Sequence, residues 1–182
     1  MRWNTFGRSA AFAALAGVGV VPWLATAGPL LGMQRALALY LLALTAVYVA
    51  GCAPSLERGL SAGLLSAGLG ACVAAATRTL PELAFGHGIV LAVSRGGVLY
   101  RQRSARTLAV EIALVGGGLL FARFLAAPGP VSMALAIWGF LLVQSVFFLV
   151  GGVRTRDGTP PRQDPFDAAH ARASALLDEL AV

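Results

Sequence analysis

The sequence has no lysine and few charged residues of either sign. Only 12% of its 182 residues are charged, whereas 58% are hydrophobic, and the mean hydropathy is +0.77. A water-soluble domain of this length needs more polar surface than that to cover its core. We therefore predict that the chain folds in lipid rather than in water.

Residues and motifs that carry common chemistry are also scarce. The two cysteines, Cys52 and Cys72, have the spacing of neither metal ligands nor a disulfide framework. The sequence contains no phosphate-binding GxxxxGK[ST] loop, no HExxH zinc motif and no acidic metal cluster. Haem held by two histidines needs both within the membrane, but of the two histidines His170 lies in the polar tail. We predict no enzymatic activity, no cofactor and no metal.

Six apolar segments make up most of the chain. Each has about the 20 residues that a helix needs to cross a hydrocarbon core about 30 Å thick. The segments are residues 9–27, 35–53, 59–76, 83–100, 107–126 and 131–153. Short connectors separate them, the first at Gly28-Pro29. We predict an all-α integral membrane protein in which residues 1–153 form a compact up-and-down bundle of about six transmembrane helices.

The arginines are distributed unevenly between the two ends of this bundle. With six spans, both termini share a side with the second and fourth connectors. That side holds Arg2, Arg8, Arg58, Arg101, Arg103, Arg106, Arg154, Arg156 and Arg162. The opposite connectors hold only Arg35 and Arg78. Because cytoplasmic loops carry the excess of basic residues, we predict a multi-pass protein of a bacterial-type inner membrane with both termini in the cytoplasm, and no nucleic-acid partner.

This orientation depends on two weaker segments and on two possible processing signals. The third and fourth segments are the least certain spans, and loss of either would move one terminus to the other side. Residues 1–27 resemble a signal peptide, which we expect to be retained as a membrane anchor. The Val-Ala-Gly-Cys sequence at 49–52 matches a lipoprotein motif. Its use would require translation from Met33, so we interpret the match as chance.

The chain becomes polar from Arg154 onwards. Residues 154–163 form a linker with Pro and Gly, and residues 164–182 are predicted to form a cytosolic amphipathic helix. Its apolar face consists of Phe166, Ala169, Ala173, Leu176, Leu177 and Leu180. A lone helix this short is marginal in water, so we expect this face to dock on a cytosolic or peripheral protein.

Two pairs of opposite charges face each other in the hairpin of the fourth and fifth segments. The turn centres near Arg103, so Arg95 and Glu111 each lie eight residues away, and Glu82 and Arg123 about twenty. Charges within a membrane are costly unless they are paired, so we expect both pairs to form. The pairs either hold the hairpin together, with Arg95 reaching the headgroups, or Arg95 and Glu111 belong to a polar path or a partner-binding surface.

One histidine and several runs of small residues are the remaining candidates for a binding site or a helix contact. His87, between two glycines, is either a packed histidine or one that binds a group such as a quinone headgroup. Gly59, Gly63 and Ala67 recur at intervals of four, and residues 116–118 are all glycine. Such faces let helices approach closely, so we expect the third segment inside the bundle or at an interface with other membrane subunits.

The sixth segment is bulky by comparison. We expect its side chains to meet lipid or another subunit: Trp138, Phe140, Leu141, Leu142, Val143, Phe147, Phe148 and Leu149. Gln144 and Ser145 interrupt this run, and we expect them to hydrogen-bond across a helix pair.

Two functions are compatible with these features. The first is a non-catalytic membrane-embedded subunit or scaffold of a larger inner-membrane complex, which docks a partner through residues 164–182. The second is a small transporter or channel component with a polar path along Arg95, Glu111 and His87. An enzyme is the least supported, because no nucleophile and base lie at one depth. The predicted partners are membrane lipid, other membrane subunits and the docked protein.

Overall fold

The computed structural model of the chain is entirely helical in the part that it describes. That part comprises residues 5–53, 55–99, 105–127 and 129–150. The all-helical prediction is confirmed there, since none of these residues lies in a strand. The predicted linker and C-terminal helix, residues 154–182, lie outside the described residues.

The described residues form six α-helices. They are α1 (Phe6–Leu31), α2 (Met33–Cys52), α3 (Leu56–Ala76), α4 (Leu80–Ala92), α5 (Ala105–Leu125) and α6 (Pro130–Ser145). A π-helix, η1 (Val93–Leu99), directly continues α4, and a 3₁₀ turn, η2 (Val146–Phe148), continues α6. Five helical stretches, all except the one that begins with α4, are long and apolar enough to cross a membrane.

The first turn of the chain lies four residues later than the sequence predicts. Gly28 and Pro29 are inside α1, and the chain reverses at Gly32, the single residue between α1 and α2. Gly32 has a φ of 82°, which side chains with a Cβ rarely adopt. The chain therefore turns at the residue that tolerates this conformation, and the helix continues through Pro29.

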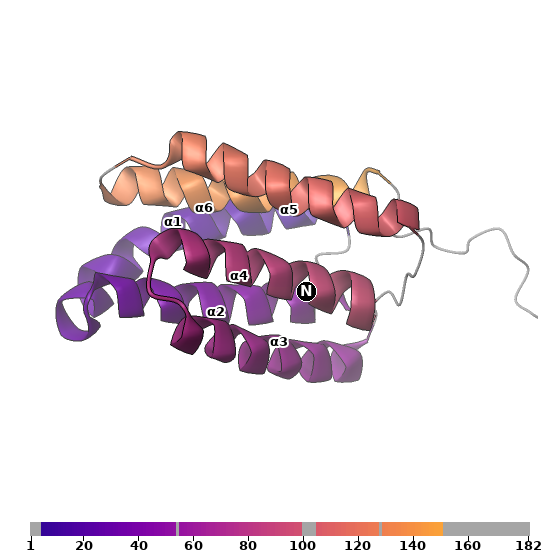
Figure 1. The fold of residues 1–182 in the computed structure, drawn as a ribbon, viewed down its shortest axis with the longest axis horizontal. Helices are drawn as coiled ribbons and strands as arrows, with labels where there is room; N and C mark the ends of the chain where they lie inside the picture. Colours follow the sequence, from indigo (N-terminus) through magenta and orange to yellow (C-terminus); the bar gives the residue numbers. More distant parts are fainter. Residues whose placement is uncertain (1–4, 54, 100–104, 128, 151–182) are drawn as a thin grey trace, which may run out of the picture.

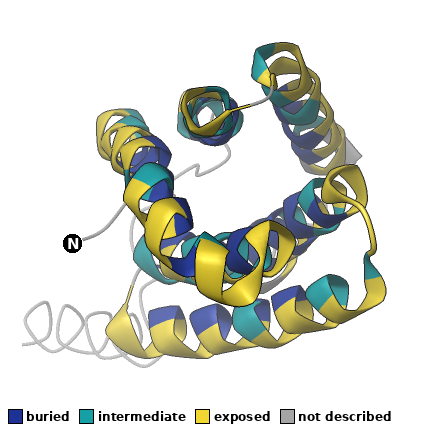
Figure 2. Ribbon diagram, turned by 90° about the vertical axis from the view of Figure 1, so that its left-hand side faces the viewer, coloured by how far each residue is buried: buried dark blue, intermediate teal, exposed yellow. Residues whose placement is uncertain are grey.

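The helices of the described part form one bundle, in which the first packs against the last (Figure 1). Helix α1 contacts both α2 and α6, α2 also contacts α3 and α4, and α5 contacts α6 and α4. Much of the outward surface is apolar and exposed (Figure 2). The bundle is thus closed by its two end helices, while α4 bridges α2 and α3 to α5.

The small residues of α3 form a close contact with α2. A Cβ atom added to Gly59 would lie 2.7 Å from the Ala50 carbonyl oxygen, and one added to Gly63 would lie 3.1 Å from the Ala50 Cβ. A neighbouring face of α3 is exposed and carries Leu60 and Leu64. The third helix therefore lies at the edge of the bundle, and α2 of the same chain already occupies its Gly59–Gly63 face.

This contact gives a direct test of the packing. We expect Gly59→Ala to lower the stability of the purified protein by about 1–3 kcal/mol, because the new methyl group overlaps the backbone of α2. Gly68→Ala on the same helix is the matched control, since nothing lies within 4 Å of a Cβ there. The control should be slightly stabilising, because Ala favours the helix over Gly. Thermal-shift measurements in detergent compare the two; equal melting temperatures would contradict the close contact.

The bulky residues of the sixth segment are divided between the interior and the surface. The prediction that they meet lipid or another subunit is wrong for Leu141 and Phe147, which are buried, whereas Leu149 is 63% exposed. Leu141 and Phe147 are 2% and 0% exposed, and α6 packs between α1 and α5. Glycines on the neighbouring helices make room for its aromatic residues. A Cβ at Gly17 of α1 would lie 2.8 Å from the Trp138 Cβ, and one at Gly118 of α5 would lie 2.9 Å from Phe140.

Candidate functional site

Arg95 lies in the π-helical segment that ends the fourth helix. A π-helix is rare, usually short, and frequent at functional sites. Here it carries the sequence Val-Ser-Arg-Gly-Gly-Val-Leu and places Arg95 inside the bundle, where the whole residue is only 1% exposed. The expectation that this arginine extends to the headgroups was therefore wrong.

Glu111 of α5 is the counter-charge of Arg95. The Arg95 Nε donates to Glu111 Oε1 at 3.0 Å, and a terminal nitrogen donates to Oε2 at 2.5 Å, so the pair is bidentate. Glu111 is 4% exposed. The two residues thus meet at the position that counting outward from the hairpin turn indicates.

Gln144 of α6 completes the surroundings of the guanidinium. Arg95 donates to its carbonyl oxygen at 3.2 Å and to its side-chain Oε1 at 3.1 Å. The Gln144 Nε2 in turn donates to the Leu114 carbonyl oxygen at 2.8 Å, which joins α6 to α5. The Phe147 ring covers the guanidinium, with 4.1 Å from its centroid to the Arg95 Cζ. Gln144 therefore bonds across the helix interface, as its position in the sequence suggests.

The remaining side of the guanidinium faces α2. Tyr48 and Cys52, one turn apart, lie close enough to Arg95 to interact with it electrostatically. The Tyr48 hydroxyl hydrogen-bonds Ser9 of α1 at 2.9 Å, and Ser145 of α6 donates to Ser9 at 2.8 Å. We call these connected residues the Arg95 cluster: Ser9, Tyr48, Cys52, Arg95, Glu111, Gln144, Ser145 and Phe147.

The Arg95 cluster joins five of the six helices at one end of the bundle. The adjacent Ser94 adds the sixth helix, because Ser66 of α3 donates to its hydroxyl at 2.8 Å. Sequence reasoning did not assign Ser9, Tyr48 or Cys52 to this site. Their depth in the bundle could have indicated this position. In an up-and-down bundle, the start of the first segment and the end of the second lie at the same depth as Arg95.

Glu82 and Arg123 do not form the second pair that the sequence predicts. Glu82 instead accepts hydrogen bonds from the backbone N–H groups of Arg78 and Thr79, at 3.0 and 3.3 Å, and completes a capping box with Thr79. Arg123 is exposed on α5. Glu82 thus bonds to the backbone at the start of its own helix instead of pairing with Arg123. Arg95–Glu111 is the one salt bridge within the described ranges.

His87 is a separate buried group. It is 4% exposed, and its Nδ1 lies 3.0 Å from the Leu83 carbonyl oxygen, whereas its Nε2 has no hydrogen-bond partner among the described residues. It precedes Arg95 by eight residues, about 12 Å along a helix. His87 therefore packs against α3, near Gly70, rather than in the Arg95 cluster.

The chemistry available to these residues is limited. No group of three His, Cys, Asp or Glu side chains suited to a metal occurs in the part of the chain that the structure covers. Residues 59–63 match the GxSxG pattern of serine hydrolases, but Ser61 lies inside α3 and donates to the Arg58 carbonyl oxygen. In the hydrolases this serine occupies a strained turn between a strand and a helix. The match therefore indicates no nucleophile.

The predicted docking residues of the tail, Phe166 to Leu180, lie outside the described residues. Comparison with known proteins adds no assignment for them or for the bundle. No family model, curated protein or solved structure matches the chain.

Proposed function

We propose that the chain is a non-catalytic, multi-pass subunit of a larger inner-membrane complex. In this proposal six helices cross the membrane, and residues 164–182 form a cytosolic helix that docks a partner. The observation that carries the proposal is the closed Arg95 cluster, in which the buried charges of the bundle neutralise each other and are covered by protein.

The outward surface of the bundle supports membrane placement. Large apolar side chains are exposed on several helices, including Leu15, Val18, Leu64, Leu120 and Phe124. A soluble monomer rarely exposes contiguous apolar patches larger than a few hundred Å². Besides the five long apolar helices, α4 and η1 run without a break from Leu80 to Leu99, which is long enough to serve as the sixth crossing.

The distribution of arginines supports cytoplasmic termini. Six crossings return the chain to its starting side, and that side carries most of the arginines, among them Arg8 and Arg58. Basic residues are retained on the cytoplasmic side during insertion. The Arg95 cluster then lies toward the cytoplasmic end of the bundle, beside the residues from which the tail continues.

The geometry does not favour the alternative of a transport path along Arg95, Glu111 and His87. A path needs water or substrate to reach the charges, but Arg95 and Glu111 are almost fully buried and bonded to each other. His87 lies about two helical turns away and faces α3 instead. A buried, satisfied ion pair of this kind fixes how helices pack.

Partner docking by the tail is tested with the full-length protein and surface variants. Leu176→Asp with Leu177→Asp places charges on the apolar face, and we expect it to remove a co-purifying protein that is retained by the wild type. Asp178→Asn with Glu179→Gln changes another face of the same predicted helix and should leave that protein bound. Quantitative mass spectrometry of affinity-purified samples measures the difference, and size-exclusion chromatography checks the bundle. An identical set of partners in all three samples would contradict docking.

A further inference from the structure

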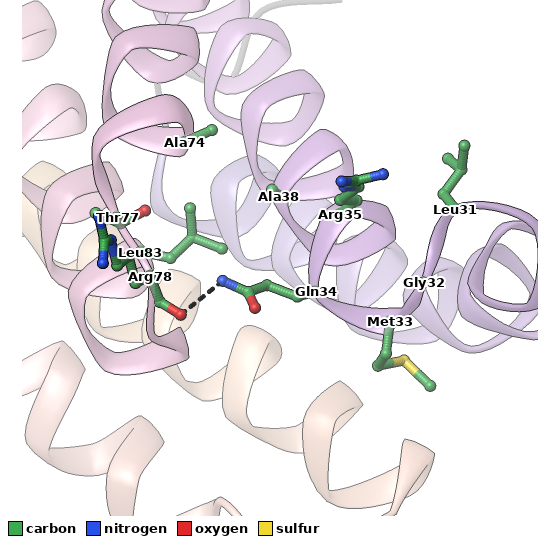
Figure 3. A pocket seen from close by; sticks show the side chains of 10 residues that line it. All are labelled: Leu31, Gly32, Met33, Gln34, Arg35, Ala38, Ala74, Thr77, Arg78 and Leu83. Atoms are coloured by element: carbon green, nitrogen blue, oxygen red, sulfur yellow. Dashed lines mark hydrogen bonds between the residues drawn. The ribbon is translucent and has the colours of Figure 1, made fainter.

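A pocket of about 540 Å³ opens at the end of the bundle opposite the Arg95 cluster. It lies between the α1–α2 turn and the α3–α4 turn, and α2, α3 and α4 form its floor with Ala38, Ala74 and Leu83. Gln34 extends across it and donates to the Arg78 carbonyl oxygen at 2.9 Å (Figure 3). The volume is within the range of pockets that bind small molecules.

Two arginines line this pocket from opposite sides. Arg35 lies on the α2 side and Arg78 on the α3–α4 side, and their side chains do not point toward one another (Figure 3). No acidic side chain is among the lining residues, and neither arginine forms a salt bridge within the described part of the chain. The nearest carboxylate in sequence, Glu82, is engaged by backbone N–H groups. The pocket thus has an excess of positive charge.

The start of α2 adds to this positive charge. No side chain caps its first turn, which contains no acidic residue. The first N–H groups of a helix lack partners within the helix and attract anions. Met33, Gln34 and Arg35 of this first turn all line the pocket.

The pocket also has an apolar side. Leu31 and Met33 are exposed at its rim. In the proposed orientation this rim lies at the outer surface of the membrane, where lipid headgroups meet acyl chains. Arg35 and Arg78 are the only arginines of the predicted outer connectors, and both line this one pocket.

We propose that this pocket binds a phosphate group attached to an apolar chain, as in an anionic phospholipid. The positive charges of Arg35 and Arg78 and the N–H groups at the start of α2 attract the phosphate, while Leu31 and Met33 contact the first carbons of the chain. This inference rests on the proposed membrane placement, because only there does the rim of the pocket meet lipid.

Native mass spectrometry of the full-length protein in detergent tests the site. With phosphatidylglycerol added, we expect one lipid bound per wild-type chain, in preference to phosphatidylcholine. Arg35→Gln with Arg78→Gln should lower the bound fraction at least tenfold. Arg123→Gln is the matched control, because this exposed arginine lies at the same end of the bundle outside the pocket, and it should bind as the wild type does.

Two further measurements separate the possible outcomes. If inorganic phosphate at millimolar concentration displaces phosphatidylglycerol, the pocket binds a phosphate group and can take it from a soluble molecule. If it does not displace the lipid, the pocket binds the phosphate only as part of the lipid. Equal binding by wild type and double variant, or equal loss in Arg123→Gln, overturns the site. Carbonate extraction of membranes tests placement separately: if the protein resists extraction while its lipid binding is unselective, the pocket proposal fails and the membrane proposal stands.

Discussion

Glu111→Gln is expected to destabilise the bundle by about 3–5 kcal/mol. The substitution keeps the shape of the side chain but removes its charge, and it leaves Arg95 buried without a counter-charge. An uncompensated buried charge is far more costly than a satisfied pair. Because the Arg95 cluster connects five helices, the loss should appear as a large drop in both yield and melting temperature in detergent.

The double substitution Arg95→Met with Glu111→Met distinguishes a structural role from a chemical one. If the pair only holds helices together, removing both charges should restore most of the stability, because apolar replacements of a buried pair are often neutral. The exposed Arg123→Gln, on the same hairpin, controls for the loss of a charge and should behave as the wild type. A Glu111→Gln protein as stable as the wild type would contradict the structure of the cluster.

Gly17→Leu is expected to separate α1 from α6. The stability of the bundle should fall by about 3 kcal/mol, at the upper end of the usual effect of overpacking. Even the first carbon of the new side chain would lie 2.8 Å from the Trp138 Cβ and 3.0 Å from the Ala134 carbonyl oxygen. The carbonyl belongs to the backbone of α6 and cannot rotate away, so the helices must move apart.

The matched control for this substitution is Gly7→Leu in the first turn of α1, where nothing lies within 4 Å of a Cβ. It should leave the melting temperature nearly unchanged. A pair of cysteines introduced into α1 and α6, in a chain whose Cys52 and Cys72 are replaced by Ala, reports the same contact, and its cross-linking should fall when Gly17→Leu is added. Undiminished cross-linking would mean that α1 and α6 are not packed through Gly17.

The sequence predicts the helices well because their apolar segments are long and their connectors short. It also predicts the meeting of Arg95 and Glu111, since a tight antiparallel hairpin fixes which residues lie level with each other. It failed for Glu82 and Arg123 because a capping box formed by neighbours in the sequence satisfies Glu82 first. Counting residues from a turn therefore predicts the depth of a side chain in the bundle. It does not predict which of several available partners a charged side chain binds.

The sequence did not predict which side of each helix faces the interior of the bundle. Helices of this chain are apolar on all sides, so no polar stripe distinguishes the buried face from the exposed one. This is why Leu141 and Phe147, which were predicted to meet lipid or another subunit, lie in the interior. It is also why Ser9 and Tyr48, separated by 39 residues, were not assigned to the same site as Arg95.

The contact between α1 and α6 also bears on biogenesis. Ribosomes release helices in order, so in the proposed membrane placement α1 is inserted before its partner α6 has been synthesised. Until Ser145 arrives, Ser9 lacks one of its two hydrogen bonds, and until Gln144 arrives the Arg95 guanidinium lacks two acceptors. These contacts of the earlier helices therefore form only when α6 is present, and a chain that stops after α5 lacks them.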